Sequence, residues 1–152
     1  MTDKSFQKAR DYAFLLLKFR LRSEKELSCR LKEKKFQAPV IREVISFLKE
    51  RRFLDDREFA RMWVASRAGR PWGPCRLRQE LRLKGVSQEI IDEELQRLQE
   101  NFPEAETVSR IARSRFERLC GREPEKAKRR VYGYLIRRGF SPASVRDALE
   151  NL

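Results

Sequence analysis

A chain of 152 residues with a net charge of +13 is long enough for one ordinary domain or for several small helical units in a row. Hydrophobic residues make up 40% of it, which excludes a simple disordered basic tail. Histidine is absent, and Cys29, Cys75 and Cys120 form no CxxC pair, so we expect no structural zinc site. Three scattered cysteines are typical of a protein in a reducing compartment. A folded chain with this charge indicates an anionic partner; the alternative is a solvated basic helical surface.

Residues 1–50 predict three helices. The first spans residues 1–20, and its apolar face consists of Phe6, Ala9, Ala13, Phe14, Leu16, Leu17 and Phe19. Ser23 and Glu26 have the spacing of a capping box and begin the second helix, which carries Leu27 and Leu31. Pro39 begins the third helix, whose apolar residues are Val40, Ile41, Val44, Ile45 and Leu48.

The middle of the chain predicts three more helices. Asp55 as N-cap begins a helix whose inward side carries Phe59, Ala60, Met62, Trp63 and Val64. Gly73 as N-cap and Pro74 as first helical residue begin the next helix, and Gly85 ends it in a left-handed conformation. Ser87 then caps the sixth helix.

The last third follows the same order. Its first helix carries Val108, Ile111, Ala112, Phe116 and Leu119, and Gly121 ends it. Ser141 and Pro142 supply the cap and the first residue of the final helix. No strand pattern of convincing length occurs.

One apolar pattern recurs three times along the chain. Its first copy is Leu27, Leu31, Phe36, Ile41, Ile45 and Leu48. A shift of 50 residues gives Leu77, Leu81, Val86, Ile91, Leu95 and Leu98. A further shift of 54 gives Val131, Leu135, Phe140, Val145, Leu149 and Leu152. Agreement at six positions in three copies indicates an internal repeat.

The sequence therefore predicts an all-α protein of three tandem three-helix repeats, at residues 1–54, 55–102 and 103–152. Such modules bury little apolar surface alone, so we expect neighbouring repeats to stack into an elongated, curved body.

Charge follows the position within the repeat. Residues 1–54 hold 15 basic and 7 acidic residues, 55–102 hold 9 and 9, and 103–152 hold 12 and 7. The middle helix of each repeat is basic, whereas the last helix of the second repeat is acidic, with Glu89, Asp92, Glu93 and Glu94. A basic stripe of this kind is typical of a surface that faces phosphates or an acidic protein groove.

The candidate contact residues lie on or beside the middle helices: Lys32, Lys34, Arg70, Arg76, Arg78, Arg82, Lys84, Lys128, Arg129, Arg130, Arg137 and Arg138. Since Leu77, Leu81 and Val86 are assigned to the core, Arg76, Arg78 and Arg82 have no predicted structural role and are the strongest candidates. Lys34, Lys84 and Arg138 precede a helix end, where complementing the helix dipole is an equal alternative.

Trp72 lies between two predicted helices. An exposed indole there would stack on a base or fill a partner's pocket, while the alternative is packing between repeats.

Catalytic chemistry finds little support. Histidine, the commonest general base, is missing, and no phosphate-binding glycine loop occurs. Asp55 and Asp56 are adjacent at a helix start, where capping explains them better than a catalytic pair. We therefore expect a binding protein without metal or cofactor. No stretch resembles a signal peptide or a membrane span, so a cytoplasmic location is expected.

Three segments together resemble the RecX family of regulators of the RecA recombinase. They are Arg20-Leu-Arg-Ser-Glu-Lys-Glu-Leu27, Phe53-Leu-Asp-Asp-Arg-Glu-Phe-Ala60, and Gly73-Pro-Cys-Arg-Leu-Arg-Gln-Glu-Leu81 with Lys84-Gly-Val86. The resemblance covers nearly the whole chain, and the threefold three-helix repeat is also the family's architecture.

The resemblance implies a modulator, usually an inhibitor, of RecA filaments in DNA repair, recombination and the SOS response. Such proteins lie along the groove of the RecA–DNA filament and hinder its growth and its ATPase, strand-exchange and coprotease activities. The implied partners are the RecA filament and single- and double-stranded DNA, directly or through the filament. We expect a monomer without membrane association.

Two positions depart from the family pattern. Lys35 and Arg52 stand where the family usually has glycine. Both positions are expected to need a left-handed or tight backbone conformation.

Two other functions remain open from the sequence. A three-helix unit with a basic helix also suits a direct DNA-binding protein with helix-turn-helix-like units, although the acidic last helix of the second repeat opposes this reading. A scaffold that binds an acidic protein and no nucleic acid is the third.

Overall fold

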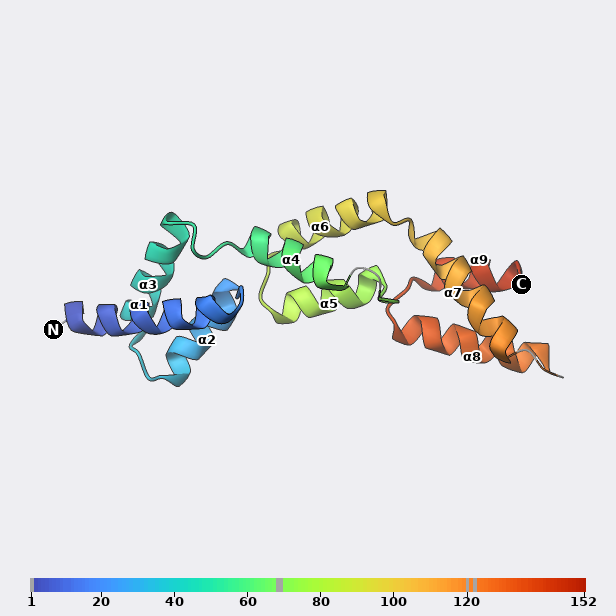
Figure 1. Cartoon of the computed structure of the whole chain (residues 1–152), viewed down its shortest axis with the longest axis horizontal. Coiled ribbons are helices and arrows are strands. Elements are labelled where there is room, and N and C mark those ends of the chain that lie inside the picture. The colour runs from blue at the N-terminus through green and yellow to red at the C-terminus, as the bar shows by residue number, and fades with distance from the viewer. Residues whose placement is uncertain (1, 68–69, 120, 122) are drawn as a thin grey trace. The chain divides into compact units, whose positions relative to one another are not determined.

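The computed structural model describes residues 2–67, 70–119, 121 and 123–152, and all regular elements in this range are helices (Figure 1). They are α1 (Thr2–Phe19), α2 (Glu24–Glu33), α3 (Ala38–Glu50), α4 (Asp56–Arg67), α5 (Pro74–Leu83), α6 (Gln88–Asn101), α7 (Glu104–Leu119), α8 (Pro124–Arg137) and α9 (Pro142–Glu150). The all-α prediction of three successive three-helix repeats is confirmed. None of these helices is long and apolar enough to cross a membrane.

Helix starts follow the predicted caps. The Ser23 hydroxyl accepts a hydrogen bond from the Glu26 N–H, and the Glu26 carboxylate accepts one from the Ser23 N–H, which completes the capping box of α2. The Asp55 carboxylate accepts from the Arg57 N–H at 2.8 Å at the start of α4. Ser141 caps α9 by accepting from the Ser144 N–H.

Two compact units make up the chain, and the middle repeat contributes to both. The first unit comprises Met1–Trp63 and Leu81–Ile91, and the second comprises Val64–Glu80 and Asp92–Leu152. The repeat boundaries at residues 54 and 102 stay a prediction, as does the elongated, curved stack.

Helices α1, α2 and α3 pack against one another in the first unit. Its core is made of Ala9, Ala13, Leu27, Leu31, Val40, Ile41, Val44, Ile45, Leu48 and Leu54. Phe6 and Phe14 of α1 make edge-to-face contacts with Phe47 and Phe53, with ring centroids 5.8 and 5.0 Å apart. The buried face of α1 does not extend to the last residue of the helix, since Phe19 is 77% exposed and not part of the core.

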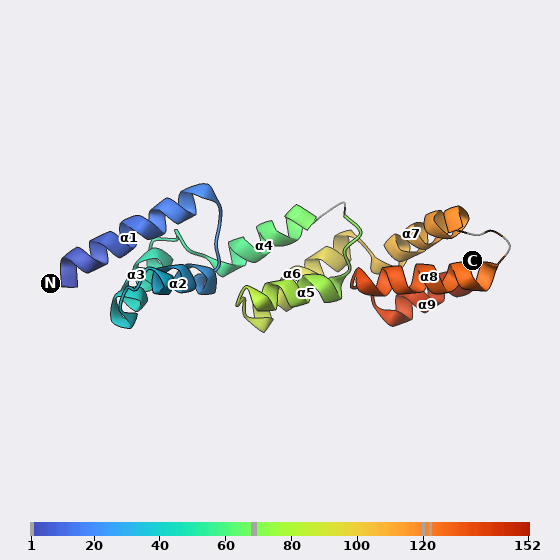
Figure 2. The ribbon, with the colours of Figure 1, turned by 90° about the horizontal axis from the view of Figure 1, so that it is seen from below.

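Helices α7, α8 and α9 form the corresponding bundle of the second unit (Figure 2). Its core is made of Val108, Ala112, Val131, Leu135, Phe140, Val145, Ala148 and Leu149.

The repeated apolar pattern predicts the buried positions closely. All of its members are buried except Phe36, Leu98 and Leu152, which are half-buried. Met62 was wrongly assigned to the inward side of α4, since it is 50% exposed. The buried stripe of α4 runs through Phe59, Ala60 and Val64, and Met62 points away from it.

Among the residues that the structure describes, four adopt positive φ angles: Lys35 at 64°, Arg52 at 59°, Gly85 at 78° and Gly139 at 85°. Lys35, Gly85 and Gly139 occupy the same place in the three repeats, directly after the middle helix. The predicted left-handed conformation is therefore confirmed at Lys35 and Arg52, where side chains with a Cβ atom carry its cost.

Candidate interaction surface

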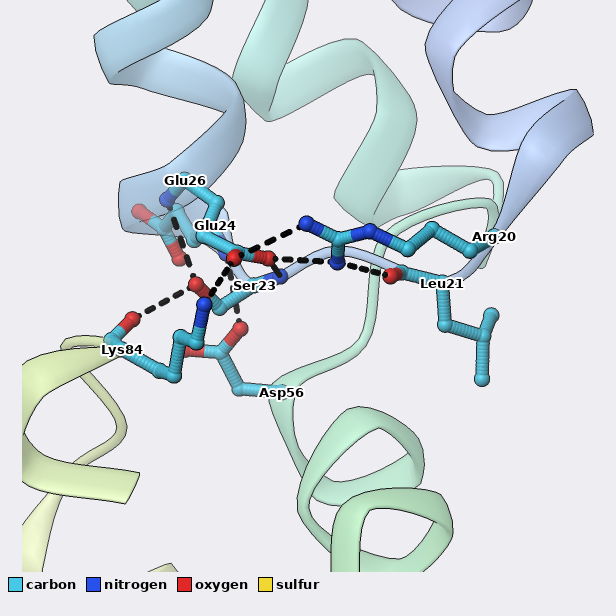
Figure 3. A network of polar contacts seen from close by, with 7 residues as sticks. All are labelled: Arg20, Leu21, Ser23, Glu24, Glu26, Asp56 and Lys84. Atoms are coloured by element: carbon cyan, nitrogen blue, oxygen red, sulfur yellow. Dashed lines mark hydrogen bonds and ion pairs between the residues drawn. The ribbon is translucent and has the colours of Figure 1, made fainter. Parts of the chain in front are cut away.

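The start of α2 meets the end of α5 in the first unit (Figure 3). The buried Ser23 hydroxyl donates to the Lys84 carbonyl at 2.6 Å. The Lys84 ammonium donates to the Glu26 carboxylate at 2.6 Å, and the Arg20 guanidinium donates to the same carboxylate at 3.0 and 3.1 Å. Glu26 is thus held by two cations.

Electrostatics at this junction strongly favour the ionised form of Glu26. Burial alone would raise the pKa of the Glu26 carboxyl, but hydrogen bonds and charge from Arg20 and Lys84 outweigh it and lower the pKa to about 2. Asp56 of α4 behaves in the opposite way. Its carboxylate accepts from the Glu24 N–H at 2.8 Å, yet burial raises the pKa of Asp56 above its usual value.

A second junction of the same kind lies in the second unit, between the start of α5 and the end of α8. The Gly73 N–H donates to the Arg138 carbonyl at 2.7 Å, and the Cys75 N–H donates to the Gly139 carbonyl at 3.0 Å. A Cβ atom on Gly73 would lie 2.2 Å from the Gly139 carbonyl carbon and oxygen. Only glycine permits this approach of one backbone to another.

The two junctions are equivalent in the repeat. Ser23 and Gly73 occupy one repeat position, and Lys84 and Arg138 occupy another, so each junction joins the N-cap of one middle helix to the carbonyl at the end of the next. The side chains differ. Glu26 pairs with Lys84 in the first junction, whereas its equivalent in the second is Arg76, which faces another cation.

One aromatic ring contacts both cations of the second junction. The guanidinium carbons of Arg76 and Arg138 lie 3.7 and 4.5 Å from the centre of the Trp72 ring. Arg138 also lies 5.0 Å from the centre of the Tyr134 ring, and Arg115 lies 3.3 Å from the same ring. Cation–π attraction of this kind is worth about 0.5–2 kcal/mol per contact and allows three guanidinium groups to gather here. The packing interpretation accounts for the position of Trp72, while its stacking on a base stays a prediction.

The candidate arginines of α5 do have structural partners, so the expectation that they lack a structural role is wrong. Arg76 donates to Glu80 at 3.2 Å, Arg78 forms an ion pair with Asp92, and Arg82 donates to Gln88 at 2.8 and 3.1 Å. Sequence spacing did not reveal Asp92 and Gln88 as partners, because both residues lie on the following helix, α6, and not on α5.

Lys84 and Lys34 are engaged as well. Lys84 is held in the first junction, with its ammonium 5.0 Å from the centre of the Trp63 ring. The Lys34 ammonium lies 5.4 Å from the centre of the Tyr12 ring. Lys32 and Arg70 are exposed and form no ion pair within the described ranges.

Helix α8 carries four further candidates without a charged partner. Arg129, Arg130 and Arg137 are exposed, Lys128 is half-buried, and none of the four forms an ion pair with a residue that the structure describes. Arg130 and Arg137 are seven residues apart, which places them on one side of the helix.

Sequence reasoning missed four residues of the junctions: Arg20, Asp56, Arg115 and Tyr134. Asp56 was assigned only to the start of its own helix, but its carboxylate receives the first N–H of α2. No spacing rule connects Arg20 with Glu26, Asp56 with Glu24 or Arg115 with Tyr134, which are 6, 32 and 19 positions apart.

Comparison with known proteins gives the family. Residues 9–48, 55–95 and 103–149 match the models for the first, second and third three-helix domains of RecX. The regulatory protein RecX of Chlorobium phaeobacteroides is 35% identical, with 100% of this chain and 98% of that protein covered, and that of Haemophilus influenzae is 33% identical, with 91% of each covered. A crystal structure of a regulatory protein RecX superposes with a TM-score of 0.84 at 25% identity, covering 99% of this chain and 74% of that one. The crystal structure of RecX from Lactobacillus salivarius superposes with a TM-score of 0.85 at 19% identity, covering 99% and 97%. The chain belongs to the RecX family.

Proposed function

We infer from its membership of the family that this chain has a regulatory role. We propose that it regulates the RecA recombinase, as an inhibitor, by binding in the groove of the RecA–DNA filament in the cytoplasm. In that position a monomer hinders filament growth and the ATPase, strand-exchange and coprotease activities of RecA. It acts by occupying the groove and needs no catalytic group, metal or cofactor.

The observation that carries this proposal is the set of arginines on α8 without charged partners. Arg129, Arg130 and Arg137 are exposed and unpaired among the described residues. On α5, Arg76 and Arg78 already pair with Glu80 and Asp92, and Arg82 is hydrogen-bonded to the uncharged Gln88. Unpaired guanidinium groups gain most from an added phosphate or carboxylate, because no existing ion pair must be broken. The main electrostatic contact is therefore assigned to α8, and α5 has mainly an internal role.

The acidic α6 argues against a direct reader of the DNA major groove. In helix-turn-helix units the last helix usually enters the groove, but α6 carries Glu89, Asp92, Glu93 and Glu94. Asp92 pairs with Arg78 and the buried Glu94 pairs with Arg97, but the net negative charge of α6 would still be repelled by the phosphates. A surface that uses the middle helices suits a filament groove better than a duplex alone.

The test is equilibrium binding of the labelled protein to RecA filaments on single-stranded DNA, to the same DNA alone, and to RecA alone, at several salt concentrations. We expect the filament to bind more tightly than either component, with affinity falling as salt rises. Changing Arg129→Glu and Arg130→Glu together should weaken filament binding and flatten its salt dependence, whereas Lys4→Glu with Lys8→Glu on α1 serves as a matched control. Equal binding to filament and bare DNA would favour the direct DNA-binding protein and refute the proposal.

A further inference from the structure

An apolar cavity of about 260 Å³ lies within the second unit. Its walls come from α4, α5, α6 and α7 and from the loops before α5, after α6 and after α8. They include the buried side chains of Val64, Leu77 and Phe140 and the half-buried Trp72. The volume is close to the lower end of small-ligand pockets, which begin at about 300 Å³, and is enough for one large apolar side chain.

The rim of the cavity is positively charged. Arg67, Arg70 and Arg110 line it together with a single acid, Glu104. Glu104 is already engaged, because its carboxylate accepts from the Ser141 N–H at 2.5 Å. Arg70 and Arg110 are exposed and form no ion pair within the described part of the chain. Two uncompensated guanidinium groups therefore face whatever enters.

Two further features mark the cavity as incomplete. Phe102 lines it and is 59% exposed, although an aromatic ring of this size is normally covered. The indole N–H of Trp72 is buried and finds no acceptor in the residues that the structure describes. A buried donor left without an acceptor costs about 1–3 kcal/mol, so an occupant that supplied a carbonyl or carboxylate would recover part of that cost.

We propose that this cavity binds an acidic peptide segment of a partner protein, which inserts one aromatic or branched aliphatic side chain and places its flanking carboxylates against Arg70 and Arg110. The apolar walls select the inserted side chain and the arginine rim selects the charge around it. This deepens the proposed function by adding a protein contact distinct from the phosphate contacts of α8.

The test uses the 152-residue chain with Trp63→Phe, which leaves Trp72 as the only tryptophan in this sequence. Synthetic peptides with the sequence Asp-Glu-Phe-Asp-Glu, capped at both ends, are titrated while the emission of Trp72 is followed. Two control peptides carry alanine in place of the phenylalanine, or lysines in place of the acids. Neither RecA nor DNA is present, so a failure here leaves the test of RecA filament binding unaffected.

We expect only the acidic phenylalanine peptide to shift the Trp72 emission, with affinity falling at least tenfold in Arg110→Glu. Arg113→Glu is the matched control, because it lies one turn further along α7 and does not line this cavity. A folded Arg110→Glu variant, judged by its helical circular dichroism, that binds as well as Arg113→Glu would overturn the proposal. Absence of a shift at millimolar peptide, or an equal shift with the lysine peptide or with a single-stranded oligonucleotide, would do the same.

Discussion

Glu26 offers the clearest test of how the first unit is held together. The substitution Glu26→Gln keeps the shape of the side chain but removes the charge that Arg20 and Lys84 share. A folded pKa of about 2, against an ordinary value of 4.5, corresponds to roughly 3 kcal/mol of stability at neutral pH, at 1.36 kcal/mol per pH unit. The Glu26 side chain is 14% exposed, but Arg20 and Lys84 are 46% and 29% exposed, so solvent screening reduces this value.

The sign of the pH dependence follows from the lowered pKa. The contribution of Glu26 to the free energy of unfolding is complete above about pH 5 and is lost as the pH falls towards 2. In this range Glu26 becomes protonated in the unfolded chain while it stays ionised in the folded chain. Asp56 changes stability in the opposite direction, since its pKa is raised, but it is present in both proteins and its effect largely cancels in their difference.

The assay is urea unfolding between pH 2 and 7, followed by the emission of Trp63 in a Trp72→Phe background, which reports on the first unit. At pH 7 Glu26→Gln should lower the free energy of unfolding by about 2–3 kcal/mol, and the gap should close by pH 2. Glu43→Gln, an exposed residue of α3 without an ion pair in the described structure, should change little at either pH. A gap that stays constant across the pH range would refute the electrostatic account of this junction.

Two backbone predictions concern glycine positions. Gly73→Ala places a Cβ atom 2.2 Å from the Gly139 carbonyl, so it should lower the free energy of unfolding of the second unit, measured in urea, by about 3 kcal/mol or more. Gly121→Ala is the control, because its Cβ atom would have no neighbour within 4 Å, and it should change this free energy by no more than about 0.5 kcal/mol. Equal effects of the two substitutions would contradict the close backbone approach at Gly73. Lys35→Gly should raise the free energy of unfolding by about 0.5–1 kcal/mol, because glycine adopts the φ angle of 64° without the steric cost of a Cβ atom. Lys35→Ala keeps the Cβ atom and should not raise the free energy of unfolding. If both variants are more stable, removal of the lysine charge is the cause instead.

Local rules predicted the helices well because their signals lie within a few residues of each other. Caps such as Ser23 and Ser141 and the helix end at Gly85 act over one turn, and the repeat frame adds three observations of each core position. Phe19 and Met62 show where periodicity fails. Phe19 is the last residue of α1 and lies off the stripe through Ala9 and Ala13, so no neighbouring helix covers it.

The candidate site was predicted less well because pairing depends on contacts between distant residues. The charge pattern located the basic helices, but it did not show that Arg78 meets Asp92 or that Lys84 meets Glu26, 58 residues away. Only the three-dimensional structure distinguishes basic side chains that pair with a carboxylate of this chain from those on α8 that do not. A basic residue in the sequence therefore predicts a ligand contact only weakly until the structure shows whether a carboxylate of the same chain pairs with it.

The repeat also explains why one junction uses an ion pair and the other an aromatic ring. With glutamate at position 26, Lys84 gains a carboxylate; with arginine at the equivalent position 76, Arg138 would meet a like charge, and Trp72 lies against both guanidinium groups. Arg76 pairs with Glu80, but Arg115 and Arg138 form no ion pair among the described residues, so the second junction keeps excess positive charge. That excess charge is what the proposed anionic partner would neutralise.

The most direct measurement of the central claim is the ATPase rate of RecA on single-stranded DNA as this protein is titrated in. We predict inhibition that is complete near stoichiometric amounts for the unchanged chain and for the Lys4→Glu, Lys8→Glu control, and that needs at least tenfold more of the Arg129→Glu, Arg130→Glu variant. An unchanged ATPase rate at stoichiometric protein, or equal inhibition by both variants, would contradict the claim that α8 holds this protein on the RecA filament.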